Sequence, residues 1–142
     1  MAQTPSARVN GRMDAARRSI LRAAWSDERA AARSARARGN VADEWKHLER
    51  AHILSQPIAG AHVRTHLAML GFGFRRRDAR EIVGQLLRLV VAGPGSWTGR
   101  YPVGNTGGAA VSAFEPMPIP EDLRAILEPS PYAPRPGEGI SE

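Results

Sequence analysis

The sequence predicts an all-α protein. We expect about four helices in antiparallel hairpins, then an extended Gly/Pro-rich strap and a short last helix. Between residues 13 and 93, apolar residues recur every three or four positions, which is the period of a helix with one buried face. Gly, Asn and Pro interrupt this pattern at short intervals, as turns between packed helices do. After residue 93 the helical period ends and most of the 11 prolines follow.

The same patterns divide the chain into four parts. We expect a flexible N-terminus over residues 1–11, a helical domain over 12–93, the strap and short helix over 94–128, and a disordered tail over 129–142. The terminal parts are polar or rich in Pro and Gly, as frayed chain ends commonly are. The core is therefore smaller than the chain.

The first two helices are separated by a clear turn signal. Residues 13–38 are rich in Ala and Arg, which are strong helix formers, and Ile20 lies on the expected apolar face. Gly39 ends this helix and Asn40 caps the next. We expect the second helix over residues 41–54, ended by Pro57.

Two further helices are expected before the strap. The third runs from about residue 58 to 72, with Leu67 on its apolar line and a glycine-containing turn after it. Asp78 caps the fourth, with Glu81 at the capping-box position, and Gly93-Pro94 ends it. The apolar side chains expected to face inward from this fourth helix are Ile82, Leu86, Leu89 and Val90.

Composition excludes several classes of function. The chain has no cysteine, so disulfides, thiolate metal sites and cysteine nucleophiles are ruled out. It lacks the run of about 20 apolar residues that a membrane helix needs, and its start does not resemble a signal peptide. We therefore expect a cytoplasmic protein without a membrane partner. The net charge of +6 comes almost wholly from Arg, and Lys46 is the only lysine.

Several stretches resemble known helical families. Gly39-Asn40, Ala51 and Leu54 are spaced like the second helix of a tetratricopeptide repeat, and the segment from Arg77 to Ile82 resembles a second such opening. HLERAHILSQ, HVRTHLAML, RRRDAREIVGQLLRL and GNTGGAAVSAFEPMPIP resemble, from about Ala31 to Leu123, the small bacterial family labelled domain of unknown function 3703. This second resemblance implies a bacterial cytoplasmic helical domain and supplies no mechanism.

The candidate site lies in the hairpin formed by the second and third helices. His52 near the end of one helix should face His62 near the start of the next, and Glu49 should face His66. Residues three or four apart share a helix face, and Glu-x-x-His and His-x-x-x-His are spacings found in helical metal sites. Three imidazoles and a carboxylate suit Zn, and also Fe, Ni, Co or Cu. His47 should point elsewhere.

Other interpretations remain open at this point. The histidines also fit a metal-free buried polar network or a solvated helix surface, since a buried imidazole needs only hydrogen-bond partners. A tetratricopeptide-like adaptor that binds a protein partner is the alternative function. No nucleophile is marked, so the sequence favours a non-enzymatic protein and identifies no catalytic residue. The oligomeric state is not indicated.

Two weaker features concern anions and nucleic acid. Gly104, Asn105, Thr106, Gly107 and Gly108, with Arg100 nearby, fit an anion-binding nest of backbone amides. The segment lacks the ending of a phosphate-binding loop, so a tight turn that needs positive φ is the favoured interpretation. The Arg-rich helix faces permit at most non-specific, salt-sensitive nucleic-acid binding, because no stacking surface is evident.

Overall fold

All regular structure in the described part of the chain is helical. The structure is a computed structural model that describes residues 13, 15–98, 103–112 and 116–128, without the side chains of 91–98. The expectations for residues 1–11 and 129–142, and for Arg100, fall outside the described residues. The helices are α1 (Ala15–Ala37), α2 (Val41–Ser55), α3 (Ala59–Arg76), α4 (Ala79–Thr98) and α5 (Glu121–Leu127).

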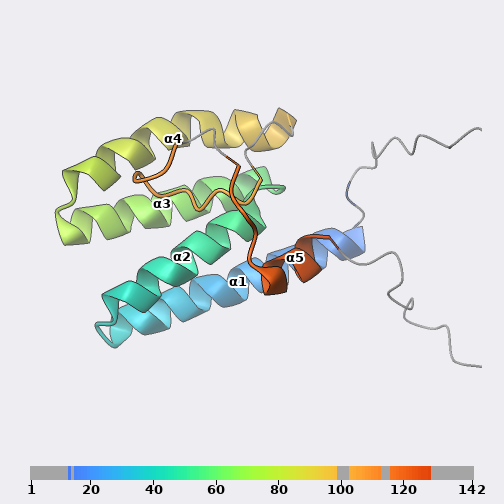
Figure 1. Ribbon diagram of the computed structural model, residues 1–142, viewed down its shortest axis with the longest axis horizontal. Coiled ribbons are helices and arrows are strands. Elements are labelled where there is room, and N and C mark those ends of the chain that lie inside the picture. Colours follow the sequence, from blue (N-terminus) through green and yellow to red (C-terminus); the bar gives the residue numbers. More distant parts are fainter. Residues whose placement is uncertain (1–12, 14, 99–102, 113–115, 129–142) are drawn as a thin grey trace, which may run out of the picture.

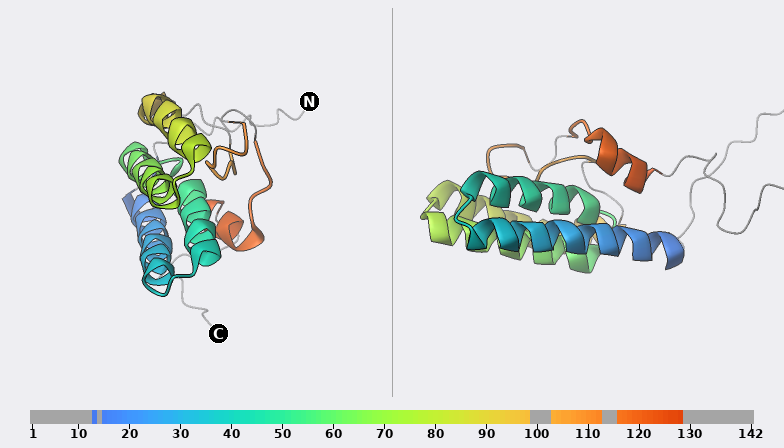
Figure 2. Two further views of the ribbon diagram at one scale, coloured as in Figure 1. Left: turned by 90° about the vertical axis from the view of Figure 1, so that its left-hand side faces the viewer. Right: turned by 90° about the horizontal axis from the view of Figure 1, so that it is seen from below.

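The helices form two hairpins that pack side by side. α1 packs along α2, α3 packs along α4, and α2 joins the hairpins by packing on α3 (Figure 1). Figure 2 shows the strap on the side of α2 away from α1, and α5 returning to the first hairpin. The predicted all-α hairpin architecture is confirmed. Among the described helices, none combines the length and the apolar character needed to cross a bilayer.

The turn signals in the sequence act as expected. Gly39 has φ of +71°, and the Asn40 side chain accepts a hydrogen bond from the Asp43 amide at 3.1 Å. The Asp78 side chain likewise accepts from the Glu81 amide at 3.0 Å. Each cap satisfies an amide that the first helical turn leaves without a partner. The Glu81 carboxylate, however, does not complete a capping box and instead hydrogen-bonds with Gln85 and the Ala109 amide.

The apolar core belongs mainly to the first hairpin and α5. Its buried residues are Leu21, Ile53, Leu54, Ile58, Ala61 and Leu123. A smaller cluster of Ala32, Leu48 and Met69 joins α1, α2 and α3, and Trp45 packs on Phe72 beside it. The first hairpin therefore hides its apolar stripe, as a surface helix of a globular protein does.

Some sequence expectations about helix faces and ends are wrong. In α1, Leu21 is buried whereas Ile20 is 59% exposed, so the true apolar face is shifted by one residue. α3 continues through two glycines to Arg76, and its Leu67 is 52% exposed. Glycine disfavours a helix by only about 1 kcal/mol, which packing against a neighbour offsets.

The largest correction concerns α4. Leu86 and Val90, expected inside, are 49% and 74% exposed, whereas Gln85 is fully buried. α4 also continues through Gly93-Pro94 to Thr98, beyond the domain boundary expected at residue 93. Proline removes one backbone hydrogen bond but does not always end a helix. α4 therefore turns a polar face inward and an apolar face outward.

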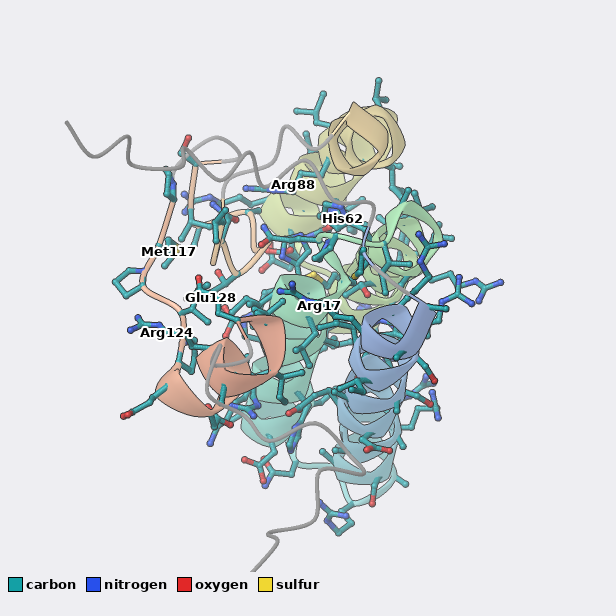
Figure 3. The ribbon with its side chains drawn as sticks, turned by 90° about the vertical axis from the view of Figure 1, so that its right-hand side faces the viewer. Arg17, His62, Arg88, Met117, Arg124 and Glu128 are labelled. Carbon is teal, nitrogen blue, oxygen red and sulfur yellow. The ribbon has the colours of Figure 1, made fainter. Side chains whose placement is uncertain are left out.

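Polar contacts hold α5 against the first hairpin. The Arg50 guanidinium bridges Glu28 of α1, at 2.7 Å, and Asp122 of α5. Arg17 of α1 donates to the carbonyl of Leu127, beside Glu128 (Figure 3). These contacts hold the end of the strap. Residues 103–112 lie against α2 and α4, through hydrogen bonds with His52, Gln85 and Glu81.

Candidate metal centre

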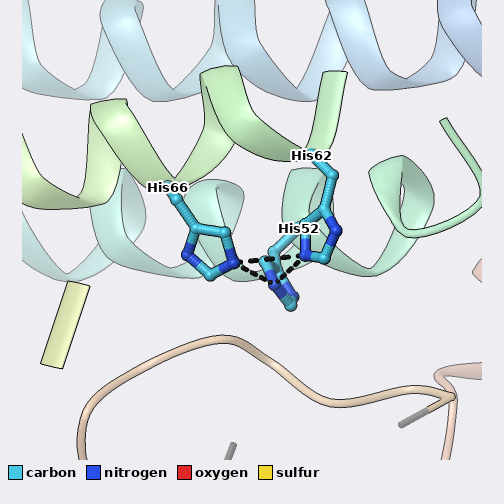
Figure 4. A group of neighbouring side chains, drawn as sticks. All are labelled: His52, His62 and His66. Carbon is cyan, nitrogen blue, oxygen red and sulfur yellow. Dashed lines mark hydrogen bonds between the residues drawn. The ribbon is translucent and has the colours of Figure 1, made fainter. Parts of the chain in front are cut away.

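Three histidines from two helices point their Nε2 atoms at one another. His52 of α2 lies 2.8 Å from His62 and 3.1 Å from His66 of α3, measured between Nε2 atoms. The third side of the triangle, between His62 and His66, is 3.2 Å (Figure 4). All three residues are at most 6% exposed. They form the group of potential metal ligands among the described residues, and we call them the histidine triad.

The size of this triangle fits a metal ion. Zn–N bonds of about 2.0–2.1 Å in tetrahedral geometry place ligand nitrogens about 3.3–3.4 Å apart. The observed separations of 2.8, 3.1 and 3.2 Å would have to open by only a few tenths of an ångström. Ring centroids 4.7 to 4.8 Å apart show that the rings converge evenly rather than stacking as a pair. The triad therefore resembles one face of a coordination tetrahedron.

The strap fixes the tautomer of His52. Its Nδ1 lies 2.7 Å from the backbone carbonyl oxygen of Asn105. A carbonyl oxygen only accepts, so Nδ1 must carry the proton and donate it. Neutral His52 therefore presents a lone pair at Nε2, toward the centre of the triad.

A glutamine of α4 fixes His66 in the same way. Its Nδ1 lies 2.6 Å from Gln85 Oε1. The Gln85 amide cannot be reversed, because its Nε2 donates to Glu81 Oε1 at 2.5 Å and to the Gly107 carbonyl at 2.8 Å. His66 Nδ1 must therefore be the donor, and its Nε2 also presents a lone pair.

Neutral histidines leave one contact of this arrangement unfavourable. The His52–His66 contact of 3.1 Å brings two lone pairs together with no proton between them. His62 brings at most one proton to its own Nε2, and that proton leaves the His52–His66 contact unchanged. Buried polar atoms that face each other without a hydrogen bond are costly. The centre of the triad is therefore suited to a cation, which would lie between these lone pairs.

The low pKa values of these histidines disfavour a proton as that cation. Burial lowers the pKa of His52 well below its usual range, and the neighbouring His66 and His62 lower it further. Burial also lowers the pKa of His66 to about 4. Arg88, whose side chain extends from α4 to the Val111 carbonyl, adds positive charge that disfavours both imidazolium ions (Figure 3). At neutral pH the lone pairs remain available to a metal ion.

The Gly-rich segment of the strap closes over the triad. Gly107 has φ of +83°, and a Cβ atom there would lie 2.6 Å from His52 Cδ2, so only glycine fits. The Gly104 and Gly107 amides donate to the side chains of Gln56, at 3.1 Å, and Asn105, at 2.9 Å. Two amides of the candidate anion nest are thus directed at protein groups, in keeping with a tight turn.

The remaining candidates lie apart from the triad. The sequence predicts that Glu49 faces His66, but Glu49 is not part of the convergent group. Its half-buried carboxylate hydrogen-bonds with Trp45 and Thr106 instead. Burial raises the pKa of Glu49. His47 points elsewhere, as predicted, and lies 2.7 Å from Glu28 through Nδ1.

Sequence reasoning missed the groups that orient the histidines. Glu81, Gln85 and Arg88 are spaced four and three residues apart on α4 and are all at most 8% exposed. This polar line at helical spacing is visible in the sequence, but apolar residues on the other side of α4 follow the same period and predict the wrong buried face. The Asn105 contact uses a backbone carbonyl, which leaves no mark in a sequence.

Comparison with known proteins identifies the family and no activity. The family described as "Protein of unknown function (DUF3703)" matches residues 19–127, from α1 to the end of α5. No curated protein and no solved structure matches the chain, so the tetratricopeptide-like similarity is not shown. The match includes all three histidines together with Gln85 and Asn105. The chain thus belongs to the DUF3703 family of proteins of unknown function.

Proposed function

We propose that this protein binds a first-row transition-metal ion, zinc above all, through the Nε2 atoms of His52, His62 and His66. The observation that carries the proposal is that the Nε2 atoms of His52 and His66 lie 3.1 Å apart and both present a lone pair. Metal-ligating histidines commonly donate their other N–H to a carbonyl or carboxylate. The Asn105 carbonyl and the Gln85 amide oxygen supply such acceptors here.

The three imidazole donors favour zinc but can also bind other first-row transition metals. Imidazole ligands suit Zn, Cu, Fe, Ni and Co, and three neutral donors leave the full charge of the ion uncompensated. Three protein ligands also leave a fourth position, which a water, a small anion or a carboxylate can fill. The proposed role is therefore metal binding or handling.

Glu49 is our proposed carboxylate for the fourth position. It lies one turn before His52 on α2, and burial raises its pKa, so a nearby dication would stabilise its ionised form. Its hydrogen bonds with Trp45 and Thr106 would have to be exchanged for the metal. We expect Glu49→Gln to weaken binding less than loss of a histidine does.

Metal content of the purified protein tests the proposal. Untagged protein from zinc-supplemented cells should retain about one metal ion per chain, measured by mass spectrometry of the elements. The double variant His52→Ala/His62→Ala should retain almost none. His47→Ala is the matched control, because His47 lies on the same helix and pairs with Glu28 instead. Circular dichroism checks that each variant is helical.

The competing interpretation is a metal-free polar network. It predicts that chelator leaves thermal stability unchanged and that the double variant and the parent contain equally little metal. Either result, in protein that is fully helical, would contradict metal binding at the triad.

A further inference from the structure

α4 carries an apolar stripe on the side that faces away from the rest of the protein. Its members lie at positions i, i+3, i+4 and i+7, and each is roughly half exposed or more. They are Val83 (55%), Leu86 (49%), Leu87 (68%) and Val90 (74%). We call this set the α4 stripe. Leu67 (52%) and Phe74 (59%) are further exposed apolar side chains on α3, the adjacent helix of the same hairpin.

The stripe exists because the inner side of α4 is polar. Glu81, Gln85 and Arg88 occupy the buried face and contact the strap or the histidine triad. A helix that turns its polar line inward and its apolar line outward lacks the usual arrangement of a surface helix. In stacked helical hairpins the last helix normally has a polar outer face. Figure 2 shows α4 at the outer corner of the bundle, where nothing in the described chain packs on that side.

We propose that the α4 stripe, with Leu67 and Phe74, is the surface through which two copies of this chain pair. The spacing of the stripe is the a, d, e, a pattern of a helix that packs on another helix. Val at the a positions and Leu at d is the combination that favours pairs of helices. A helical partner of similar character is therefore expected, and a second copy supplies one.

The size and the apolar character of the patch favour self-association. The exposed side chains present on the order of 600 Å² of apolar surface, the upper end of the largest patch on typical monomers. A stable dimer buries about 800 Å² from each partner, so the patch supplies most of such an interface. The stripe itself carries no charge, because Arg88 within its span turns to the strap. Two copies can therefore place these uncharged side chains against each other around a two-fold axis.

The oligomeric state of the full chain tests this pairing. By light scattering after size exclusion, at tens of micromolar, the protein should have twice its chain mass of 15.4 kDa. Leu87→Glu and Val90→Glu should shift it to one chain mass, with unchanged helix content. Ile20→Glu is the matched control, since Ile20 is 59% exposed on α1, outside the stripe, and this variant should stay dimeric.

A crosslinking measurement tests the pairing even if the glutamate variants fold poorly. The chain has no cysteine, so a cysteine introduced by Leu86→Cys can form a disulfide only with another copy. Leu86 is central in the stripe, so in a pair whose two-fold axis passes near the middle of the stripe the two introduced cysteines lie close together. Mild oxidation should give covalent dimer for Leu86→Cys and little for Ile20→Cys. A monomeric parent protein, dimeric stripe variants, or equal crosslinking at both positions would overturn the proposal.

Discussion

The two hairpins of this protein use opposite arrangements of polarity. The first hairpin buries Leu21, Ile53 and Leu54 in an apolar core. The second hairpin buries His62, His66 and Gln85 on its inner side and exposes Leu87 and other apolar residues outside. Both hairpins have similar helix lengths and turn signals. The difference therefore lies in what each face contacts, and not in how the helices form.

The contrast indicates that the second hairpin depends on partners for its stability. An apolar core stabilises itself, at roughly 25 cal/mol for each Å² of apolar surface removed from water. A polar interior contributes little net stability unless every group in it is satisfied. Here the Nε2 lone pairs of His52 and His66 face each other, and the proposed metal ion would accept both. The apolar core of the first hairpin should thus be insensitive to metal, whereas the polar interface between α2, α3 and α4 should depend on it.

The largest expected effect is in the first hairpin. Leu54 is fully buried, so Leu54→Ala should lower the free energy of unfolding by about 2–5 kcal/mol through lost burial and a cavity. Because Leu54 belongs to the apolar core cluster and is not one of the triad, the loss should be the same with zinc and with chelator. Urea unfolding measures both, with the exposed Ile20→Ala as a control expected within about 0.5 kcal/mol of the parent. A cost that vanished on chelation would break the contrast between the hairpins.

Acid should destabilise the second hairpin in metal-free protein. The pKa of His66 is about 4 in the fold against 6.5 normally, so the unfolded chain binds more protons between these values. The free energy of unfolding should therefore fall as pH drops from about 6.5 to 4, by about 3 kcal/mol from His66 alone. The lowered pKa of His52 adds to this loss.

Unfolding at a series of pH values, in the presence of chelator, measures that slope. His66→Gln removes one titrating group and should flatten the profile, whereas His47→Ala should preserve it. Identical slopes for the parent and His66→Gln would show that the triad does not titrate as its burial requires.

A smaller effect should separate metal affinity from stability. Gln85→Ala removes the acceptor that holds His66 in its ligating tautomer, so zinc affinity should fall 10- to 100-fold. Gln56→Ala is the matched control. Gln56 is also a buried glutamine, and it contacts the strap by accepting from the Gly104 amide.

Competition with a coloured zinc chelator measures both affinities. Gln56→Ala should lower thermal stability yet bind zinc as the parent does. Equal losses of affinity in the two variants would mean that Gln85 acts through general stability instead of through His66.

Local signals in the sequence predicted much of the fold. Gly39, Asn40, Pro57 and Asp78 punctuate the helices where the structure does, because caps and turns depend on neighbouring residues alone. The end of α4 was missed, since a helix that passes Gly93-Pro94 does so against its own propensities. Local patterns do not report contacts with distant parts of the chain.

The candidate site was predictable in its ligands and less so in its surroundings. The spacing of His62 and His66 on one helix, opposite His52, was enough to bring the triad together. Glu49 was expected opposite His66, but its contacts with Trp45 and Thr106 depend on where the strap lies. Apolar periodicity predicted the wrong inward face for α4. Such a period identifies a buried face only when that face contacts the same chain.

X-ray absorption spectroscopy of the zinc-loaded protein tests the central claim most directly. If the histidine triad binds the metal, the spectrum should show about three imidazole nitrogens at about 2.0–2.1 Å and one further light atom. The imidazole signal should disappear in His52→Ala/His62→Ala and persist in His47→Ala. A zinc environment without imidazole scattering, or one that the double variant leaves unchanged, would contradict metal binding at this site.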